Sequence, residues 1–104
     1  MKDEKPFTFA GLWETWHGEG EPLETCAILT TDANTLAKEV HDRMPVILTG
    51  DNALAWIDPA IDDPKALTAM LRPFDAKKMI CYPVSVAIGN VRNNNASLIE
   101  PVKV

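Results

Sequence analysis

The side chains that could do nucleophilic or acid-base chemistry are few and widely spaced in this chain. It contains two cysteines, Cys26 and Cys81, and two histidines, His17 and His41. His41 opens the run at residues 41–43 (HDR), which places an imidazole beside a carboxylate and a guanidinium. Imidazole titrates near neutral pH and guanidinium binds oxyanions, so this run could transfer a proton and hold an anion in one place.

Neither cysteine is expected to take part in that chemistry. Both lie in apolar, strand-like runs, which favours buried free thiols over a disulfide. A nucleophilic pair of Cys26 and His41 is disfavoured, because burial in apolar surroundings makes a thiol inert. The chain has no CxxC or HxxxH spacing, so we expect no metal site and no other cofactor.

Each polar candidate also has a structural interpretation. His41 could end a helix, where the helix dipole favours it. Arg43 could form a salt bridge with Asp42 or with another nearby acid, and Thr30 could be satisfied by bonding across a strand pair. Asp42 could orient His41 or simply lie at the surface.

Alternation of apolar residues predicts a hairpin in the first third of the chain. Residues 6–13 alternate in the manner of a strand that is buried on at least one side, and residues 23–31 resume a β-like pattern. Between them, residues 17–22 (HGEGEP) are polar and rich in helix and strand breakers, which indicates a flexible tip.

Short helices and a short strand are predicted next. Asp32 is a suitable N-cap for a helix over residues 33–40, which would deliver His41 at its C-terminal end. Residues 46–48 read as a short buried strand. A second helix starts at Gly50-Asp51 and closes before Pro59. A third starts with Asp63 as N-cap and Pro64 at the first helical position, and stops before Pro73.

The last third of the chain predicts one more strand. Residues 79–91 alternate, with Pro83 marking an edge or a bulge, and residues 93–95 (NNN) are expected to form a turn or loop before a short closing segment. There is no repeat and no linker. The pattern therefore predicts one domain over residues 1–104, of α+β class around a sheet.

Bulk properties limit the possible functions. Hydrophobic residues make up 46% and charged residues 24%, which is typical of globular proteins. No apolar run approaches a membrane span and no secretory leader follows Met1, so a cytoplasmic protein without a membrane partner is expected. The net charge of -5 argues against a stand-alone nucleic-acid binder, so any contact with DNA needs a local patch. Three tryptophans, Trp13, Trp16 and Trp56, could stack on bases, although core packing is the favoured interpretation.

Several segments in order resemble the SRAP family of SOS-response-associated peptidases, which act as abasic-site crosslinkers. They are residues 9–14 (FAGLWE), 25–34 (TCAILTTDAN), 41–48 (HDRMPVIL), 82–85 (YPVS) and 98–101 (LIEP). The resemblance implies the C-terminal part of an SRAP fold, a mixed sheet or partial pseudo-barrel with short covering helices. It also implies single-stranded DNA with an abasic site as the partner.

The resemblance further implies roles for single residues. His41 matches the histidine that assists sugar opening and proton transfer, while Arg43 and Thr30 match positions of the DNA-facing cleft. The family reaction needs an N-terminal cysteine, whose amine and thiol close a thiazolidine on the sugar aldehyde, and has an associated autoproteolytic peptidase activity. Residue 2 here is Lys2, and the asparagine and glutamate motifs would precede Met1. Glu14 does not inherit the glutamate's role.

The chain by itself is therefore expected to be inactive in crosslinking. An alternative is a non-catalytic remnant that pairs its open strand edges with another copy, giving a homo-oligomer such as a homodimer, with a structural or unknown role. A third hypothesis is an unrelated Cys-His hydrolase.

Overall fold

The structure, a computed structural model, describes residues 1–103. Within these residues, six short strands, two α-helices and four 3-10 helices follow one another. In order they are β1 (Thr8–Phe9), β2 (Gly11–Trp16), β3 (Leu23–Ile28), β4 (Thr30–Asp32), η1 (Ala37–Glu39), β5 (Arg43–Pro45), β6 (Ile47–Leu48), α1 (Gly50–Trp56), α2 (Pro64–Thr68), η2 (Ala76–Lys78), η3 (Val86–Gly89) and η4 (Ala96–Ile99).

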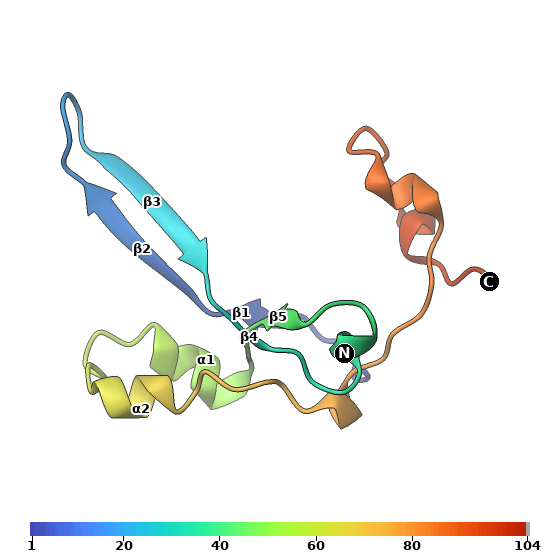
Figure 1. The fold of residues 1–104 in the computed structure, drawn as a ribbon, viewed down its shortest axis with the longest axis horizontal. Coiled ribbons are helices and arrows are strands. Elements are labelled where there is room, and N and C mark those ends of the chain that lie inside the picture. Colours follow the sequence, from blue (N-terminus) through green and yellow to red (C-terminus); the bar gives the residue numbers. More distant parts are fainter. Residues whose placement is uncertain (104) are drawn as a thin grey trace.

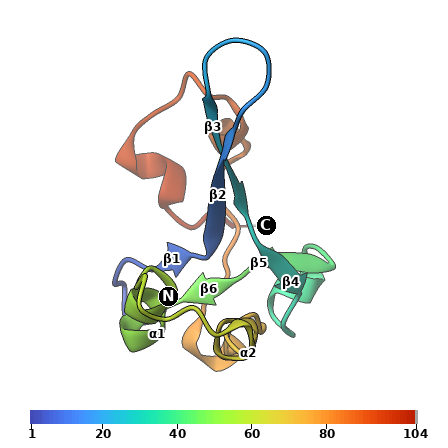
Figure 2. The ribbon, with the colours of Figure 1, turned by 90° about the vertical axis from the view of Figure 1, so that its left-hand side faces the viewer.

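Three antiparallel two-stranded sheets radiate from one junction. The pairs are β1 with β6, β2 with β3, and β4 with β5. They meet at Ala10, Leu29 and Val46, which are joined by a closed ring of backbone hydrogen bonds of 2.9 Å: Ala10 donates to Val46, Val46 to Leu29, and Leu29 to Ala10. Figure 2 shows the three ribbons leaving this point in different directions. The chain therefore changes strand partner at each of the three residues.

This junction corrects the predicted first strand. Residues 6–13 were expected to form one strand, but the chain divides at Ala10 into β1 and β2, which pair with different partners. Ala10 is buried and its N–H and C=O both belong to the junction, which leaves no room for a continuous ladder. The predicted strand over 23–31 divides at Leu29 for the same reason.

The predicted hairpin is confirmed as β2 and β3. Its register runs from Gly11 opposite Ile28 to Trp16 opposite Leu23. It projects away from the rest of the chain (Figure 1), and its side chains are mostly exposed. The prediction of buried faces is therefore wrong for these residues, because within residues 1–103 no third strand or helix layer lies over the hairpin.

Two expectations about burial fail with it. Cys26 on β3 and Cys81 are both free thiols, as expected, but both are exposed. Trp13 and Trp16 on β2 are exposed as well, rather than packed in a core. The ring of Trp16 folds back over Gly18, where a Cβ would collide with it.

The segment after β4 also differs from its prediction. Asp32 ends a strand and caps no helix, and residues 33–36 form a loop before the single turn of η1. Cross-strand pairing of Asp32 with Arg43 competes with helix capping and takes Asp32 into the ladder. The predicted strand over 46–48 is present as β6, preceded by β5 and the junction residue Val46.

Both later helices are confirmed. Helix α1 begins after Thr49, at Gly50 with a φ of 55°, and ends at Trp56. Helix α2 starts at Pro64, and the side chain of Asp63 accepts a hydrogen bond of 3.0 Å from the N–H of Lys65. That bond satisfies one of the free donors at the helix start.

The predicted strand over residues 79–91 is wrong. The segment is irregular up to Ser85, whose hydroxyl accepts from Ala87 N–H and starts η3. Pro83 cannot donate to a ladder, and from Tyr82 onward the segment is hydrogen-bonded to its own continuation: Tyr82 OH donates to Ile99 O at 2.9 Å and Val102 N to Pro83 O at 3.0 Å. This C-terminal part lies on the opposite side of the molecule from the hairpin (Figure 1).

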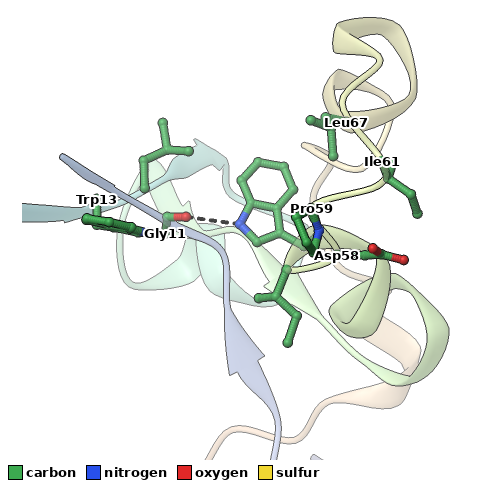
Figure 3. Close-up of a pocket in the computed structure, with 9 residues that line it drawn as sticks. Gly11, Trp13, Asp58, Pro59, Ile61 and Leu67 are labelled. Atoms are coloured by element: carbon green, nitrogen blue, oxygen red, sulfur yellow. Dashed lines mark hydrogen bonds between the residues drawn. The ribbon is translucent and has the colours of Figure 1, made fainter.

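The core is small and sits at the junction. Ala10, Val46 and Leu48 are buried, and partly buried residues pack against them: Ala53 and Trp56 of α1, Met70 and Leu71 just after the end of α2, and Leu29. Trp56 also fixes α1 to the base of the hairpin, since its Nε1 donates to Gly11 O at 3.0 Å (Figure 3). The α+β class is thus confirmed, with antiparallel sheets, while the partial pseudo-barrel stays a prediction. Across residues 1–103, no helix is both long and apolar enough to span a bilayer.

Candidate functional site

Pairing of β4 with β5 brings two predicted site residues onto one face. Asp32 lies opposite Arg43, and Thr30 lies opposite Pro45. Side chains alternate between the faces of a strand, so Thr30, Asp32 and Arg43 share the outer face. Met44 follows Arg43 on β5, so its side chain points to the opposite face, where it is buried. The burial of Met44 therefore decides that Arg43 faces outward.

The guanidinium of Arg43 holds this face together. Nη1 lies 3.0 Å from Asp32 Oδ1, and Nη2 donates to the backbone oxygen of Thr30 at 2.9 Å and to its hydroxyl at 3.1 Å. Arg43 and Thr30 are thus in direct contact. The salt bridge is made with Asp32 across the ladder, and its side chains are 49% and 88% exposed, so its contribution to stability is below about 1 kcal/mol.

His41 stands beside this face, just after η1. Its backbone N–H donates to Ala37 O at 3.0 Å, and its ring is exposed. The backbone N–H of Arg43 donates to Nδ1 of His41 at 3.0 Å. With Nδ1 occupied as an acceptor, the neutral ring carries its proton on Nε2 and presents an N–H to the outside. The predicted orienting role therefore belongs to the backbone of Arg43 instead of the carboxylate of Asp42.

Asn34 is a positioning residue that the sequence interpretation missed. Its side-chain oxygen accepts from Ala37 N–H at 2.8 Å, and its amide nitrogen donates to Phe74 O at 2.7 Å. Asn34 thereby starts the turn that carries His41 and ties it to the segment before η2. An Asn three residues before the first turn of η1 is a capping signal that could have identified it.

A small apolar cavity lies next to His41. Its volume is about 270 Å³, and its lining includes His41, Arg43, Met44, Met79 and Cys81. Cys81 is thus the cysteine that shares a cavity with His41, whereas Cys26 lines a separate surface hollow on the hairpin with Leu12 and Trp13.

The local charge of the site is balanced. Arg43 is accompanied by Asp32 on the same face, and Asp42 lies next to it in the chain. The ladder is therefore not a strongly basic patch by itself. Over the described part of the chain, no three His, Cys, Asp or Glu side chains converge as metal ligands.

Comparison with known proteins assigns the chain to a family. The chain is a member of the family described as SOS response associated peptidase (SRAP), which matches residues 1–91. It is 46% identical over 101 residues to the abasic site processing protein YoqW of Bacillus subtilis (strain 168), covering 96% of this chain and 45% of that protein. It is 35% identical over 99 residues to the abasic site processing protein HMCES of Gallus gallus, covering 92% of this chain and 29% of that protein.

A solved structure has a similar fold. The X-ray crystal structure of a protein from Bacteroides thetaiotaomicron superposes with a TM-score of 0.82 at 29% sequence identity, covering 97% of this chain and 46% of that chain. The chain thus spans less than half the length of the relatives that it matches. The family resemblance inferred from the sequence segments is confirmed.

Proposed function

We propose that these residues carry the part of an SRAP site that binds single-stranded DNA at an abasic site. The observation that carries the proposal is the hydrogen-bonded group of the exposed residues His41, Arg43 and Thr30, of which His41 and Arg43 line an apolar cavity. Relatives named abasic site processing proteins support it. A cytoplasmic location belongs to the same proposal.

In this proposal His41 acts on the lesion sugar. An abasic sugar is a cyclic hemiacetal, and opening it removes a proton from the anomeric hydroxyl and adds one to the ring oxygen. A donor aimed at the ring oxygen assists the second transfer. The outward Nε2–H of neutral His41 can donate a hydrogen bond that polarises the ring oxygen while solvent supplies the proton, and the N–H of Arg43 fixes the orientation of the ring through Nδ1.

Arg43 and Thr30 act on the DNA backbone. The Thr30 hydroxyl accepts from Arg43, so its own proton is available to a phosphate oxygen. The guanidinium is half exposed and can offer a further N–H on its outer edge. The nearby apolar cavity beside His41 would receive the unpaired sugar or a flanking base.

The covalent step is not assigned to these residues. A thiazolidine requires the α-amine and the thiol of one cysteine, and both Cys26 and Cys81 are internal, with their nitrogens in peptide bonds. Crosslinking and the peptidase activity named in the family description therefore need a group from elsewhere in an SRAP domain. For residues 1–104 we propose reversible, lesion-selective binding.

The test compares two oligonucleotides that differ by a single abasic site. Fluorescence anisotropy of labelled single strands should show tighter binding to the lesion strand, and a denaturing gel should show no adduct. His41→Ala should remove the preference for the lesion, whereas His17→Ala at the hairpin tip should keep it. Equal affinity for both strands, or a preference that survives His41→Ala, would overturn the proposal.

A further inference from the structure

The chain exposes far more surface than its mass predicts. Its accessible surface is 8711 Å², whereas a compact 11.5 kDa protein exposes about 5,800 Å². Its radius of gyration is 17.1 Å, against about 13 Å for a compact domain of this length. The excess of about 2,900 Å² is surface that a folded domain normally removes from water.

The β2–β3 hairpin accounts for the clearest part of this excess. In its register, Trp13, Cys26 and Ile28 lie on one face, and Leu12, Trp16, Leu23 and Ala27 lie on the other. Trp13 is 72% exposed, and Leu12, Trp16, Leu23 and Ile28 are each more than half exposed. A strand pair that is apolar on both faces is typical of the middle of a sheet covered on both sides. An isolated two-stranded ribbon is at best marginally stable in water.

An apolar cavity continues this surface towards the helices. It has a volume of about 400 Å³ and lies between the start of β2 and the segment that joins α1 to α2. Figure 3 shows Trp13 on one side of it and Pro59, Ile61 and Leu67 on the other. This groove therefore has the start of β2 as one wall and the segment around Pro59 as the other.

The charges on the hairpin are all of one sign. Residues 11–28 contain four glutamates, Glu14, Glu19, Glu21 and Glu24, and no lysine or arginine. Glu14 lies opposite Thr25, and Glu24 opposite Thr15, so each face of the ribbon carries one carboxylate among its apolar side chains. A surface that fits this hairpin must supply cations next to apolar groups.

We propose that the hairpin and the groove are covered by the complementary portion of an SRAP domain, the part of that domain that these residues do not match. It would supply strands that pair with the open edges of β2 and β3, apolar side chains for both faces, and basic residues opposite the glutamates. The Bacteroides thetaiotaomicron structure supports this occupant, because the present fold recurs there as 46% of a longer chain.

A second copy of the chain fits the surface less well. A standard interface buries only about 800 Å² per partner, well below the excess found here. Edge pairing of two hairpins would extend the ribbon but leave both of its faces in water. It would also bring two sets of glutamates together, since the same patch occurs on both sides of a two-fold contact. The area, the two-sided apolarity and the charge therefore all favour the complementary portion.

The test uses two polypeptides expressed together. One is this chain, and the other is the part of the Bacillus subtilis YoqW protein outside the 101 matched residues. The expected result is a one-to-one complex by light scattering, with slow amide hydrogen exchange over residues 11–28. In the chain alone, the same amides should exchange fast. This experiment contains no DNA, so its failure is separate from a failure of lesion binding.

Charge reversal provides the matched control. Glu14→Lys with Glu24→Lys should weaken the complex by about tenfold or more, because it places like charges across the contact. Glu39→Lys with Glu100→Lys makes the same change in net charge away from the hairpin and should leave the affinity unchanged. A homodimer with protected hairpin amides would assign the surface to a second copy. That result, or equal weakening by both double variants, would overturn the proposal.

Discussion

The backbone N–H of Arg43 donates to Nδ1 of His41 across 3.0 Å, so one residue both fixes the imidazole and carries the guanidinium that binds Thr30. The main chain of Arg43 orients His41, and its side chain crosses the ladder. Substitution of Arg43 can therefore remove the contacts of its guanidinium while the backbone N–H continues to orient His41. The orientation of the His41 ring and the charge of the Arg43 side chain can therefore be tested separately.

Neutralising Asp32 should strengthen binding to DNA. Asp32→Asn removes the carboxylate that holds Arg43 Nη1, which frees the fork for phosphate and removes a like charge. The free energy of unfolding should fall by about 0.5 kcal/mol at most, because the pair is largely exposed. Anisotropy titration and urea unfolding measure the two effects. Asp42→Asn makes the same change in net charge and should have a smaller effect on affinity, and an equal gain would contradict the role of the ladder.

Arg43 should account for one phosphate contact in the salt dependence of binding. For single strands, each neutralised phosphate contributes about 0.7 to the slope of log affinity against log salt concentration. Arg43→Gln should reduce the slope by about that amount. Arg92→Gln, on the C-terminal segment, is the control and should leave the slope unchanged. An unchanged slope in Arg43→Gln would mean that Arg43 has a purely structural role.

Shortening a buried side chain at the junction should lower the free energy of unfolding. Val46 is 0% exposed, so Val46→Ala leaves a cavity in the small core and should lower the free energy of unfolding by about 2 kcal/mol. Val91→Ala is the same substitution at a residue that is 96% exposed, and its effect should stay within about 0.5 kcal/mol. Urea unfolding followed by circular dichroism compares them. Similar losses in both variants would argue against a core centred on Val46.

The cap of α2 should be detectable as a local effect. Asp63→Ala removes the acceptor for Lys65 N–H and should cost about 1 kcal/mol. Asp62→Ala removes an acid of the same type one residue before the cap and should cost less. Hydrogen exchange at the amides of Lys65 and its neighbours reports the change. The assignment fails if both variants accelerate exchange equally.

Both thiols should react in the folded chain. Cys26 and Cys81 are exposed and free, so an aromatic disulfide reagent should modify two thiols per chain without denaturant. The variants Cys26→Ser and Cys81→Ser assign the two rates. A thiol that reacts only after denaturant is added would restore the buried state expected from the sequence. Slower labelling of Cys26 in the presence of the complementary portion would support the proposed cover.

Local signals predicted the elements that depend on neighbouring residues. The hairpin, α1 and α2 were predicted correctly, since their turn residues and caps, such as Asp63 with Pro64, lie next to the elements they define. The resemblance of residues 41–48 to the SRAP family was likewise correct. The direct contact between Arg43 and Thr30 results from the pairing of β4 with β5, and that pairing was not predicted from the sequence.

The wrong predictions share a physical cause. Apolar alternation in β2 and β3 indicates strands that are covered on both faces, but it does not identify what covers them. Trp13 and Cys26 were therefore predicted to be buried, although no covering layer lies among residues 1–103. Asp32 had two possible roles, and its long-range pairing with Arg43 prevailed over the local one. Both outcomes depend on pairing between segments that are distant in the sequence, which the pattern in a short window does not report.

The ring of hydrogen bonds at Ala10, Leu29 and Val46 has a consequence for the order of folding. Each bond of the ring joins segments that are distant along the chain, so two loops must close before the ring is complete. Contacts of this kind are formed slowly, because the entropy of closure is lost before the contacts compensate for it. We therefore expect the local contacts of β2 with β3 to form first, although they are only marginally stable by themselves, and the junction to set the rate at which the three ribbons acquire their final directions.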